Sequence, residues 1–303
     1  METHSSIAET LRVKGPPVWL DMDQKELDDA YDQTVYAPNQ PLLAARRKIA
    51  SESMIKRFGP PERVAYGPSE IEKLDIYRCA KPNASVMVYI HGGAWRNGAA
   101  KDFAFQAEMY INAGANLVII DFVQVQDAGG SLLPMIQQVR NAVAWVYKNA
   151  TSFGADPNRL FVSGHSSGAH LTGCVLVTDW QKDFGLPASF IKGGLIVSGM
   201  YDLKPVRLSK RSKYVNFTDE IEQVLSSQRH IDRLTAPIIV AYGSQETPEF
   251  QRQSRDFAAA VKAAGKSVEL IVGEGFNHFE MQETLGNPYG LGGRAALKLM
   301  GLS

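Results

Sequence analysis

A serine flanked by glycines is the residue in this 303-residue chain whose setting most clearly suggests chemistry. Residues 164–168 read Gly-His-Ser-Ser-Gly, with an apolar run at 160–163 before them and a segment of helical character, 167–178, after them. A sharp turn from a strand into a helix leaves no room for neighbouring Cβ atoms, so glycines are needed around the serine. The strained turn lifts the serine Oγ clear of the sheet, and the helix aims its amide N–H groups there. The spacing predicts a nucleophile, Ser166, rather than a flexible turn.

A second glycine motif follows another apolar run, where residues 91–95 read His-Gly-Gly-Ala-Trp. Adjacent glycines after a strand let backbone N–H groups point into a cavity, as binding of a tetrahedral oxyanion requires. Because a nucleophile is predicted elsewhere, we favour an oxyanion hole over a plain glycine turn. Its donors would be the amides of Gly92, Gly93 and Ser167. His91 is expected to brace the loop rather than to titrate in catalysis.

Two later loops offer an acid and a base at strand ends. Glu246 follows the apolar run 237–242, and His278 follows the last apolar run of the chain. In an open α/β sheet, ligands bind beyond the carboxyl ends of the strands, so residues delivered there can meet at one site. His278 therefore has the position of a general base, with Glu246 to orient it. Asp202, which follows another apolar run, is the rival acid.

The positions of the remaining acid and histidine candidates favour structural roles over catalytic ones. Glu249 is expected in the first turn of a helix that begins at Pro248. The other histidines lie at the N-terminus, in or after the serine motif, or in a polar segment: His4, His165, His170 and His230.

Composition describes an ordinary water-soluble globule. The 32 Lys and Arg residues balance 32 Asp and Glu residues, so electrostatics gives no argument for binding nucleic acid or an anionic membrane. Residues 1–14 lack the apolar core of a secretion signal, and no apolar run is long enough to span a bilayer. Cys79 and Cys174 have no ligand spacing, which predicts reduced, buried thiols and a cytoplasmic protein.

The pattern of apolar runs predicts how the candidate residues are positioned. These runs alternate with helical segments such as 131–150 and 248–264, which is typical of an α/β fold with a mostly parallel sheet and helices on both faces. The expected strands are 71–77, 85–90, 116–122, 160–163, 193–198, 237–242 and 267–272. Residues 156–158, Asp-Pro-Asn, are expected to turn the chain into the serine strand. No repeat or linker interrupts the pattern, so we expect one domain over residues 1–303.

Residues 1–60 have a different pattern and are expected to form a helical appendage. Asp23 can cap a short helix through Tyr31, and a longer helix is expected from about Pro41 to Gly59. The apolar residues of the longer helix would lie on one face: Leu42, Ala45 and Ile49. Its basic residues would form a solvated exterior rather than a partner site: Arg46, Arg47, Lys48, Lys56 and Arg57.

Taken together, these motifs resemble the α/β-hydrolase superfamily, whose triads follow the chain order serine, acid, histidine. Residues 91–95 place the resemblance in the branch related to hormone-sensitive lipase. More narrowly, the chain is similar to the kynurenine formamidase (arylformamidase) family over about residues 20–285. That similarity rests on the tryptophan closing the glycine motif, on residues 164–171, and on Pro-Glu-Phe at 248–250 with Gln-Ser at 253–254.

Two departures from the family patterns bear on the assignment. Lipase-like esterases commonly have a Tyr-Arg-Leu-Ala-Pro type run after the third strand, whereas residues 121–125 read Asp-Phe-Val-Gln-Val. This difference weakens the interpretation as a generic esterase. Relatives usually have aspartate where Glu246 stands, and the extra methylene of glutamate needs a slightly different backbone. Asp202 therefore stays open as the acid.

The resemblance implies an amidase that hydrolyses N-formyl-kynurenine to kynurenine and formate without a metal or organic cofactor. Ser166 would be the nucleophile, His278 the base and Glu246 the acid. A carboxylesterase acting on small aryl or acyl esters is the alternative, and a non-catalytic binding module is a third hypothesis. The oligomeric state stays open, a homodimer included.

The sequence also offers candidates for substrate binding, each of which could have a purely structural role instead. Four aromatic residues would either line the substrate pocket or belong to ordinary packing: Trp95, Phe122, Tyr201 and Phe276. Four basic residues would either reach the substrate carboxylate or form a solvated loop: Arg207, Lys210, Arg211 and Lys213.

Overall fold

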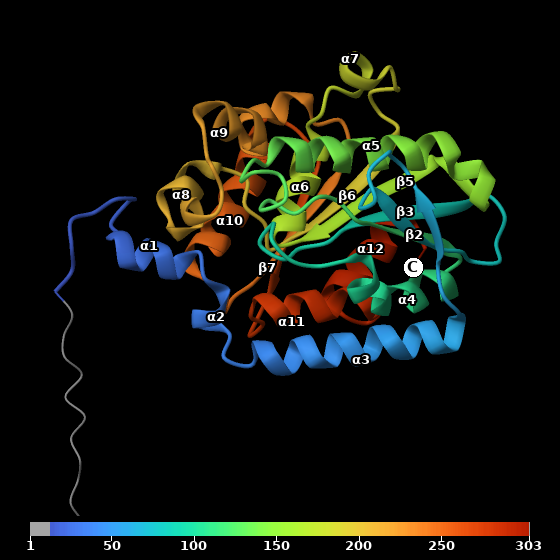
Figure 1. The fold of residues 1–303 in the computed structure, drawn as a ribbon, viewed down its shortest axis with the longest axis horizontal. Coiled ribbons are helices and arrows are strands. Elements are labelled where there is room, and N and C mark those ends of the chain that lie inside the picture. Colours follow the sequence, from blue (N-terminus) through green and yellow to red (C-terminus); the bar gives the residue numbers. More distant parts are fainter. Residues whose placement is uncertain (1–12, 303) are drawn as a thin grey trace, which may run out of the picture.

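One eight-stranded sheet with helices on both faces organises residues 13–302, which are the residues that the computed structural model describes (Figure 1). The strands are β1 (Glu62–Ala65), β2 (Lys73–Tyr77), β3 (Ala84–Ile90), β4 (Ala115–Ile120), β5 (Ala155–His165), β6 (Ile191–Val197), β7 (Ile238–Gly243) and β8 (Val268–Gly273). Their order is β1-β2-β4-β3-β5-β6-β7-β8. Strands β3 to β8 are parallel, whereas β2 pairs antiparallel with β1 and β4. The predicted α/β fold is confirmed.

The described residues include twelve α-helices, several of which cover the two faces of this sheet. They are α1 (Gln24–Ala30), α2 (Gln33–Tyr36), α3 (Gln40–Phe58), α4 (Ala107–Asn112), α5 (Leu133–Asn149), α6 (Ser167–Leu176), α7 (Trp180–Phe184), α8 (Leu203–Leu208), α9 (Asp219–Leu225), α10 (Pro248–Ala263), α11 (His278–Glu283) and α12 (Leu291–Met300). Two of the short 3-10 helices, η1 (Ala100–Gln106) and η3 (Lys210–Lys213), reach the site described below. In Figure 1, α5 and α6 lie on one face of the sheet, and α3, α4, α11 and α12 lie on the other.

Alternate residues of the central strands enter two separate cores. Val86 and Val88 of β3 belong to the core shared with α5, α6 and α10, whereas Met87 and Tyr89 belong to the core shared with α4, α11 and α12. Successive side chains of a strand point to opposite faces, so a strand covered on both faces is apolar throughout. This packing fixes the carboxyl ends of the parallel strands at one edge, where the candidate residues follow.

The strand predictions needed two corrections. Strand β1 was not predicted, because it is a four-residue edge strand of mostly exposed residues with no apolar run. Strand β5 begins at Ala155 and includes residues 156–158, which were expected to form a turn. The register of β5 against β3 shifts there, and Asn158 N donates to Asp156 Oδ1 at 2.8 Å. The turn chemistry of Asp-Pro-Asn is thus used inside an irregular strand start.

The N-terminal segment forms the expected helices, but the apolar residues expected on one face of α3 are exposed. Asp23 caps α1, and its side chain accepts from Glu26 N. In α3, Leu42 is 61% exposed and Ile49 is 66% exposed, whereas Leu43 and Met54 are buried. Apolar residues are spread around this helix, so its pattern did not define the face that packs on the rest of the chain.

Three smaller expectations can also be compared with the structure. Cys174 is buried, and burial raises the pKa of its thiol to about 12, but Cys79 is partly exposed, contrary to expectation. Among residues 13–302, no helix is both long enough and apolar enough to cross a membrane. Residues 1–12, which include His4 and the start of the expected appendage, lie outside the described residues.

Candidate active site

Ser166 lies in a strained turn between β5 and α6, with φ of 60° and ψ of −126°. A Cβ on Gly164 would lie 2.3 Å from Thr172 Oγ1, and a Cβ on Gly168 would lie 2.1 Å from the Ile90 carbonyl oxygen. Contacts this short do not occur, so both positions need glycine. Backbone strain of about 1–3 kcal/mol persists only where the surroundings enforce it, and every residue of α6 is buried. The turn holds the Ser166 side chain at the wall of a pocket.

Glu246 and His278 form a buried hydrogen-bonded pair. His278 Nδ1 donates to Glu246 Oε2 at 2.8 Å. The other carboxylate oxygen, Oε1, accepts from Ser198 Oγ at 2.6 Å and from Gly243 N at 2.7 Å. Burial raises the pKa of Glu246 to about 7, and the Ser198 and Gly243 donors oppose that rise by favouring the ionised form. An ionised Glu246 keeps the proton on Nδ1, so that Nε2 of His278 is free to accept one.

His278 shares its pocket with Ser166. The pocket has a volume of about 540 Å³, within the range of roughly 300–1,000 Å³ typical of small-molecule sites. No hydrogen bond joins Ser166 Oγ to His278 Nε2 in the described chain, and unliganded sites often hold such groups apart until substrate binds. Burial, followed by the positive charge of Arg211, lowers the pKa of His278 to about 3, which favours the neutral imidazole that can act as a base.

His165 connects the two loops, a role that sequence reasoning missed. Its Nε2 lies 2.9 Å from the carbonyl oxygen of His278, and the two rings are 4.5 Å apart between centroids. Burial holds the pKa of His165 well below its usual range, so the ring is neutral and Nε2 is the donor. The sequence signal was adjacency, because His165 immediately precedes Ser166. Ser198 was also missed; it lies one residue after β6 with φ of 58°.

The three amides expected to form the oxyanion hole lie around Ser166. Gly92 and Gly93 line the pocket, and Ser167 is the first residue of α6. Within residues 13–302, the amides of these three residues donate to no protein acceptor, so they are available to a ligand. Trp95 N donates to Ser167 Oγ at 3.2 Å, which fixes the glycine loop against α6.

His91 lies under the glycine loop in the position expected for a brace. Its ring stacks between Phe103 and Phe122, with centroids 5.3 Å and 4.4 Å away. Its Nδ1 lies 2.8 Å from the carbonyl oxygen of Gly92. Burial lowers the pKa of His91, so the ring is neutral and supports the loop by packing and one hydrogen bond.

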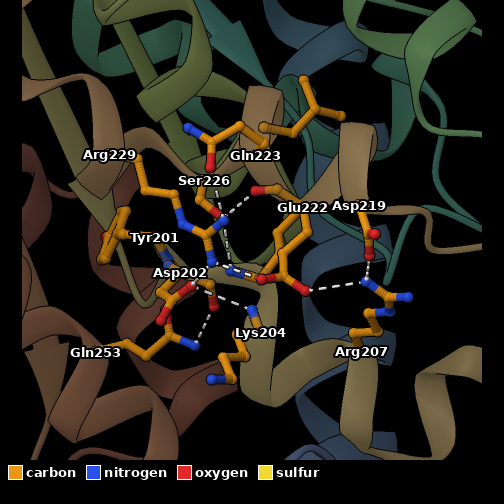
Figure 2. A network of polar contacts seen from close by, with 12 residues as sticks. Tyr201, Asp202, Lys204, Arg207, Asp219, Glu222, Gln223, Ser226, Arg229 and Gln253 are labelled. Atoms are coloured by element: carbon orange, nitrogen blue, oxygen red, sulfur yellow. Dashed lines mark hydrogen bonds and ion pairs between the residues drawn. The ribbon is translucent and has the colours of Figure 1, made fainter.

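Asp202 does not reach His278. Figure 2 shows it in a separate polar network, where Oδ1 accepts from Lys204 N at 3.1 Å and from an Arg229 guanidinium nitrogen at 3.2 Å. Its side chain caps the start of α8. Of the two carboxylates left open by the sequence, Glu246 is the one in contact with the imidazole.

The four aromatic candidates do not line the pocket, so of the two alternatives left open for them the structure shows packing. The Nε1 of Trp95 donates to His170 Nδ1 at 3.2 Å within the core. Phe122 packs on His91, Tyr201 stacks on Phe257, and Phe276 lines a separate groove beside α3. Large aromatic residues that follow a strand fill the space beneath the loops, because packing there buries more of their surface.

The aromatic residues that line the pocket are different: Tyr31, Phe103, Tyr214 and Phe279. The N-terminal segment forms one wall through residues 31–34, Gln40, Ala44, Arg47 and Lys48. The hydroxyl of Tyr31 donates to Glu249 Oε2 at 2.9 Å and accepts from Gln253 Nε2 at 2.7 Å, which anchors this wall to α10. Arg47 donates to Gln282 and lies over the Phe103 ring, so the expectation of a fully solvated basic face is wrong.

The basic residues after β6 have different environments. Arg207 is paired with Asp219 and Glu222 in the network of Figure 2, and Lys213 is exposed. Lys210 and Arg211 line the pocket. The pocket wall carries five cationic side chains and two carboxylates: Arg47, Lys48, Arg96, Lys210 and Arg211, with Asp32 and Asp102. Within residues 13–302, no group of three or more His, Cys, Asp or Glu side chains has an arrangement that could hold a metal ion.

Comparisons with known proteins agree with this geometry. The family model BD-FAE matches residues 74–190. The chain is 29% identical over 301 residues to a kynurenine formamidase of Danio rerio, covering 94% of this chain and 99% of that protein. It is 28% identical over 236 residues to the esterase LipC of Mycobacterium tuberculosis, covering 70% of this chain and 57% of that protein.

A solved structure shares the fold. The thermophilic esterase Est2 of Thermogutta terrifontis superposes with a TM-score of 0.64 at 22% identity, over 80% of this chain and 90% of that one. The sheet order, the serine turn and these similarities lead to one conclusion. The chain has the α/β-hydrolase fold, and its similarities to kynurenine formamidases and esterases fit a hydrolase of the branch related to hormone-sensitive lipase.

Proposed function

We propose that the chain is an arylformamidase that hydrolyses N-formyl-kynurenine to kynurenine and formate. One structural observation supports the chemistry: a strained serine and an imidazole that is hydrogen-bonded to a buried carboxylate line a single pocket. The substrate is supported by similarity to a kynurenine formamidase over nearly the full length of both chains. The aromatic side chains in the pocket wall can pack on the aryl ring of such a substrate.

In the proposed mechanism, Ser166 Oγ attacks the formyl carbon while His278 Nε2 takes the hydroxyl proton. Glu246 holds the imidazole and stabilises its charged form. The amides of Gly92, Gly93 and Ser167 donate to the tetrahedral oxyanion. The C–N bond then breaks, and His278 gives its proton to the departing arylamine. Water, deprotonated by the same imidazole, attacks the formyl-serine ester and releases formate and the free serine.

Acyl-group size provides the test of this substrate. A buried methylene contributes only about 0.8 kcal/mol, so attraction alone discriminates poorly between acyl chains, and selectivity for formyl must come from exclusion. Packed walls resist deformation, so overlap penalises a longer acyl group more strongly. We expect kcat/KM to fall steeply from N-formyl- to N-acetyl- to N-butyryl-kynurenine. The rates are compared with that for 4-nitrophenyl acetate on the same preparation.

A carboxylesterase is the second candidate, and the similarity to esterase LipC favours it. It would use the same nucleophile, base and oxyanion donors on small aryl or acyl esters. A series in which kcat/KM rises with acyl length, together with slow N-formyl-kynurenine turnover, would favour this candidate over the formamidase.

A further inference from the structure

Arg211 is a buried guanidinium in the wall of the pocket, and it is only 6% exposed. It lies in η3 and donates two hydrogen bonds, both to neutral acceptors. One goes to the Tyr214 hydroxyl at 3.1 Å, and the other goes to the Tyr31 carbonyl oxygen at 3.2 Å. Its Nε has no hydrogen-bond partner within residues 13–302. A guanidinium has five N–H donors, so most of its capacity is unused.

No carboxylate neutralises this charge in the described chain. Of the two carboxylates in the wall, Asp32 pairs with Lys210 and Asp102 accepts from Ala99 N. Glu249, which contacts Tyr31, pairs with Arg252. Arginine stays protonated in proteins, and a buried charge without a counter-charge is costly. A site that retains such a group is one in which a ligand can supply the missing anion.

Aromatic rings hold Arg211 in place without neutralising it. Its Cζ lies 5.3 Å from the centroid of the Trp95 ring and 6.0 Å from that of Phe250. Trp95 is itself fixed by its hydrogen bond to His170. The cation–π contacts thus pre-organise the guanidinium. They leave its N–H groups free to donate hydrogen bonds in the plane of the guanidinium.

Arg211 and His278 line the same pocket and share one aromatic neighbour. The Phe250 ring that contacts Arg211 also packs edge-on against His278, with centroids 5.1 Å apart. Arg96, another cation of the wall, lies over the Tyr214 ring, with its Cζ 4.1 Å from the ring centroid. A ligand that reaches His278 therefore passes a wall with an excess of positive charge.

We propose that Arg211 binds a carboxylate on the leaving group of the substrate. The pocket then takes aryl amides or aryl esters whose aryl side chain ends in a carboxylate, an inference that rests on the proposed function for the bond that is cleaved. The planar fork of arginine matches a carboxylate and can donate two parallel hydrogen bonds to it. The proposal gives a structural reason for the single unpaired buried arginine in this wall.

The first test measures inhibitor binding, so its outcome does not depend on whether the enzyme cleaves aryl amides or aryl esters. 4-Oxo-4-phenylbutyrate and its primary amide differ only in the charged group, and both compete against 4-nitrophenyl acetate. We expect the acid to bind wild-type protein about 10–100-fold more tightly than the amide, as for a charge-assisted hydrogen bond. Arg211→Gln should remove this preference, and Arg211→Lys, which keeps the charge but not the fork, should retain part of it.

Lys213→Gln is the matched control, because it removes one positive charge from the same short helix at an exposed position. It should leave the preference for the acid unchanged. Equal binding of acid and amide by wild-type protein would overturn the proposal without any variant. The proposal can therefore be tested even if the Arg211→Gln protein does not fold. An equal loss of affinity for both inhibitors in a folded Arg211→Gln protein, checked by thermal unfolding, would also overturn it.

The second test separates this inference from the proposed function. N-formyl-kynurenine and its analogue without the carboxylate carry the same formamide bond. Arg211→Gln should lower kcat/KM for the first about 10–100-fold more than for the second. If wild-type protein cleaves neither formamide, the proposed function fails while the inhibitor pair still decides the anion site. If both are cleaved equally well by wild-type protein, the anion site fails and the formamidase function stands.

Discussion

The change Glu246→Gln tests whether this carboxylate orients His278. All three polar partners of the carboxylate are donors: His278 Nδ1 at 2.8 Å, Ser198 Oγ at 2.6 Å and Gly243 N at 2.7 Å. A glutamine amide has one oxygen and one NH2 group, so it cannot accept on both sides. If the NH2 group faces His278, the imidazole must carry its proton on Nε2, and it can no longer accept the proton of Ser166.

Two costs combine in this variant. The productive orientation places the NH2 group against the Gly243 N–H, and a buried donor without an acceptor costs about 1–3 kcal/mol. Replacing the ionised acceptor by a neutral amide also weakens the hydrogen bond to the imidazolium, by about 1.5–3 kcal/mol. Since 1.36 kcal/mol is tenfold in rate, the expected loss in kcat is roughly 10²–10⁴.

The assay measures steady-state hydrolysis of N-formyl-kynurenine and of 4-nitrophenyl acetate by protein whose folding is verified by thermal unfolding. Asp202→Asn serves as the control, since Asp202 belongs to the separate network of Figure 2 and should keep activity within about threefold. Activity of Glu246→Gln within tenfold of wild type, with Asp202→Asn strongly impaired, would refute the reasoning about the acid.

Three further predictions concern the same group of residues. Ser166→Ala and His278→Ala should each lower kcat on the order of 10⁶-fold, and the double variant little more, because these residues act as a unit; near-normal turnover of folded Ser166→Ala protein would remove the mechanism. The Glu246–His278 pair is active when Glu246 is ionised and the imidazole is neutral. Burial raises the pKa of Glu246 to about 7, so protonation of the pair should make kcat/KM fall as the pH drops below about 7. Ser198→Ala removes a donor that favours ionised Glu246, so this acid limb should move to higher pH; an unchanged or lower limb in the pH profile would contradict it.

The sequence determined the parts of this protein that local chemistry encodes. Glycine spacing around Ser166 is readable because the strained turn and the close approach of neighbouring atoms exclude any Cβ. The apolar runs mark strands buried on both faces, and the cap residue Asp23 marks the start of α1. Parallel strands place their carboxyl ends at one edge, so the loops with Glu246 and His278 were identifiable from chain order.

Which distant residues meet depends on how the elements pack against one another. The choice of Glu246 over Asp202 depends on how the loop after β7 packs against the start of α11, which no local pattern encodes. The same is true of Tyr31, whose hydroxyl contacts a residue 218 positions along the chain and anchors one wall of the pocket. Trp95 was recognised by its motif, but only packing showed that it supports Arg211 rather than facing the pocket. Periodicity and spacing specify elements, whereas pocket walls are built by contacts between elements, whose geometry follows from filling the whole core at once.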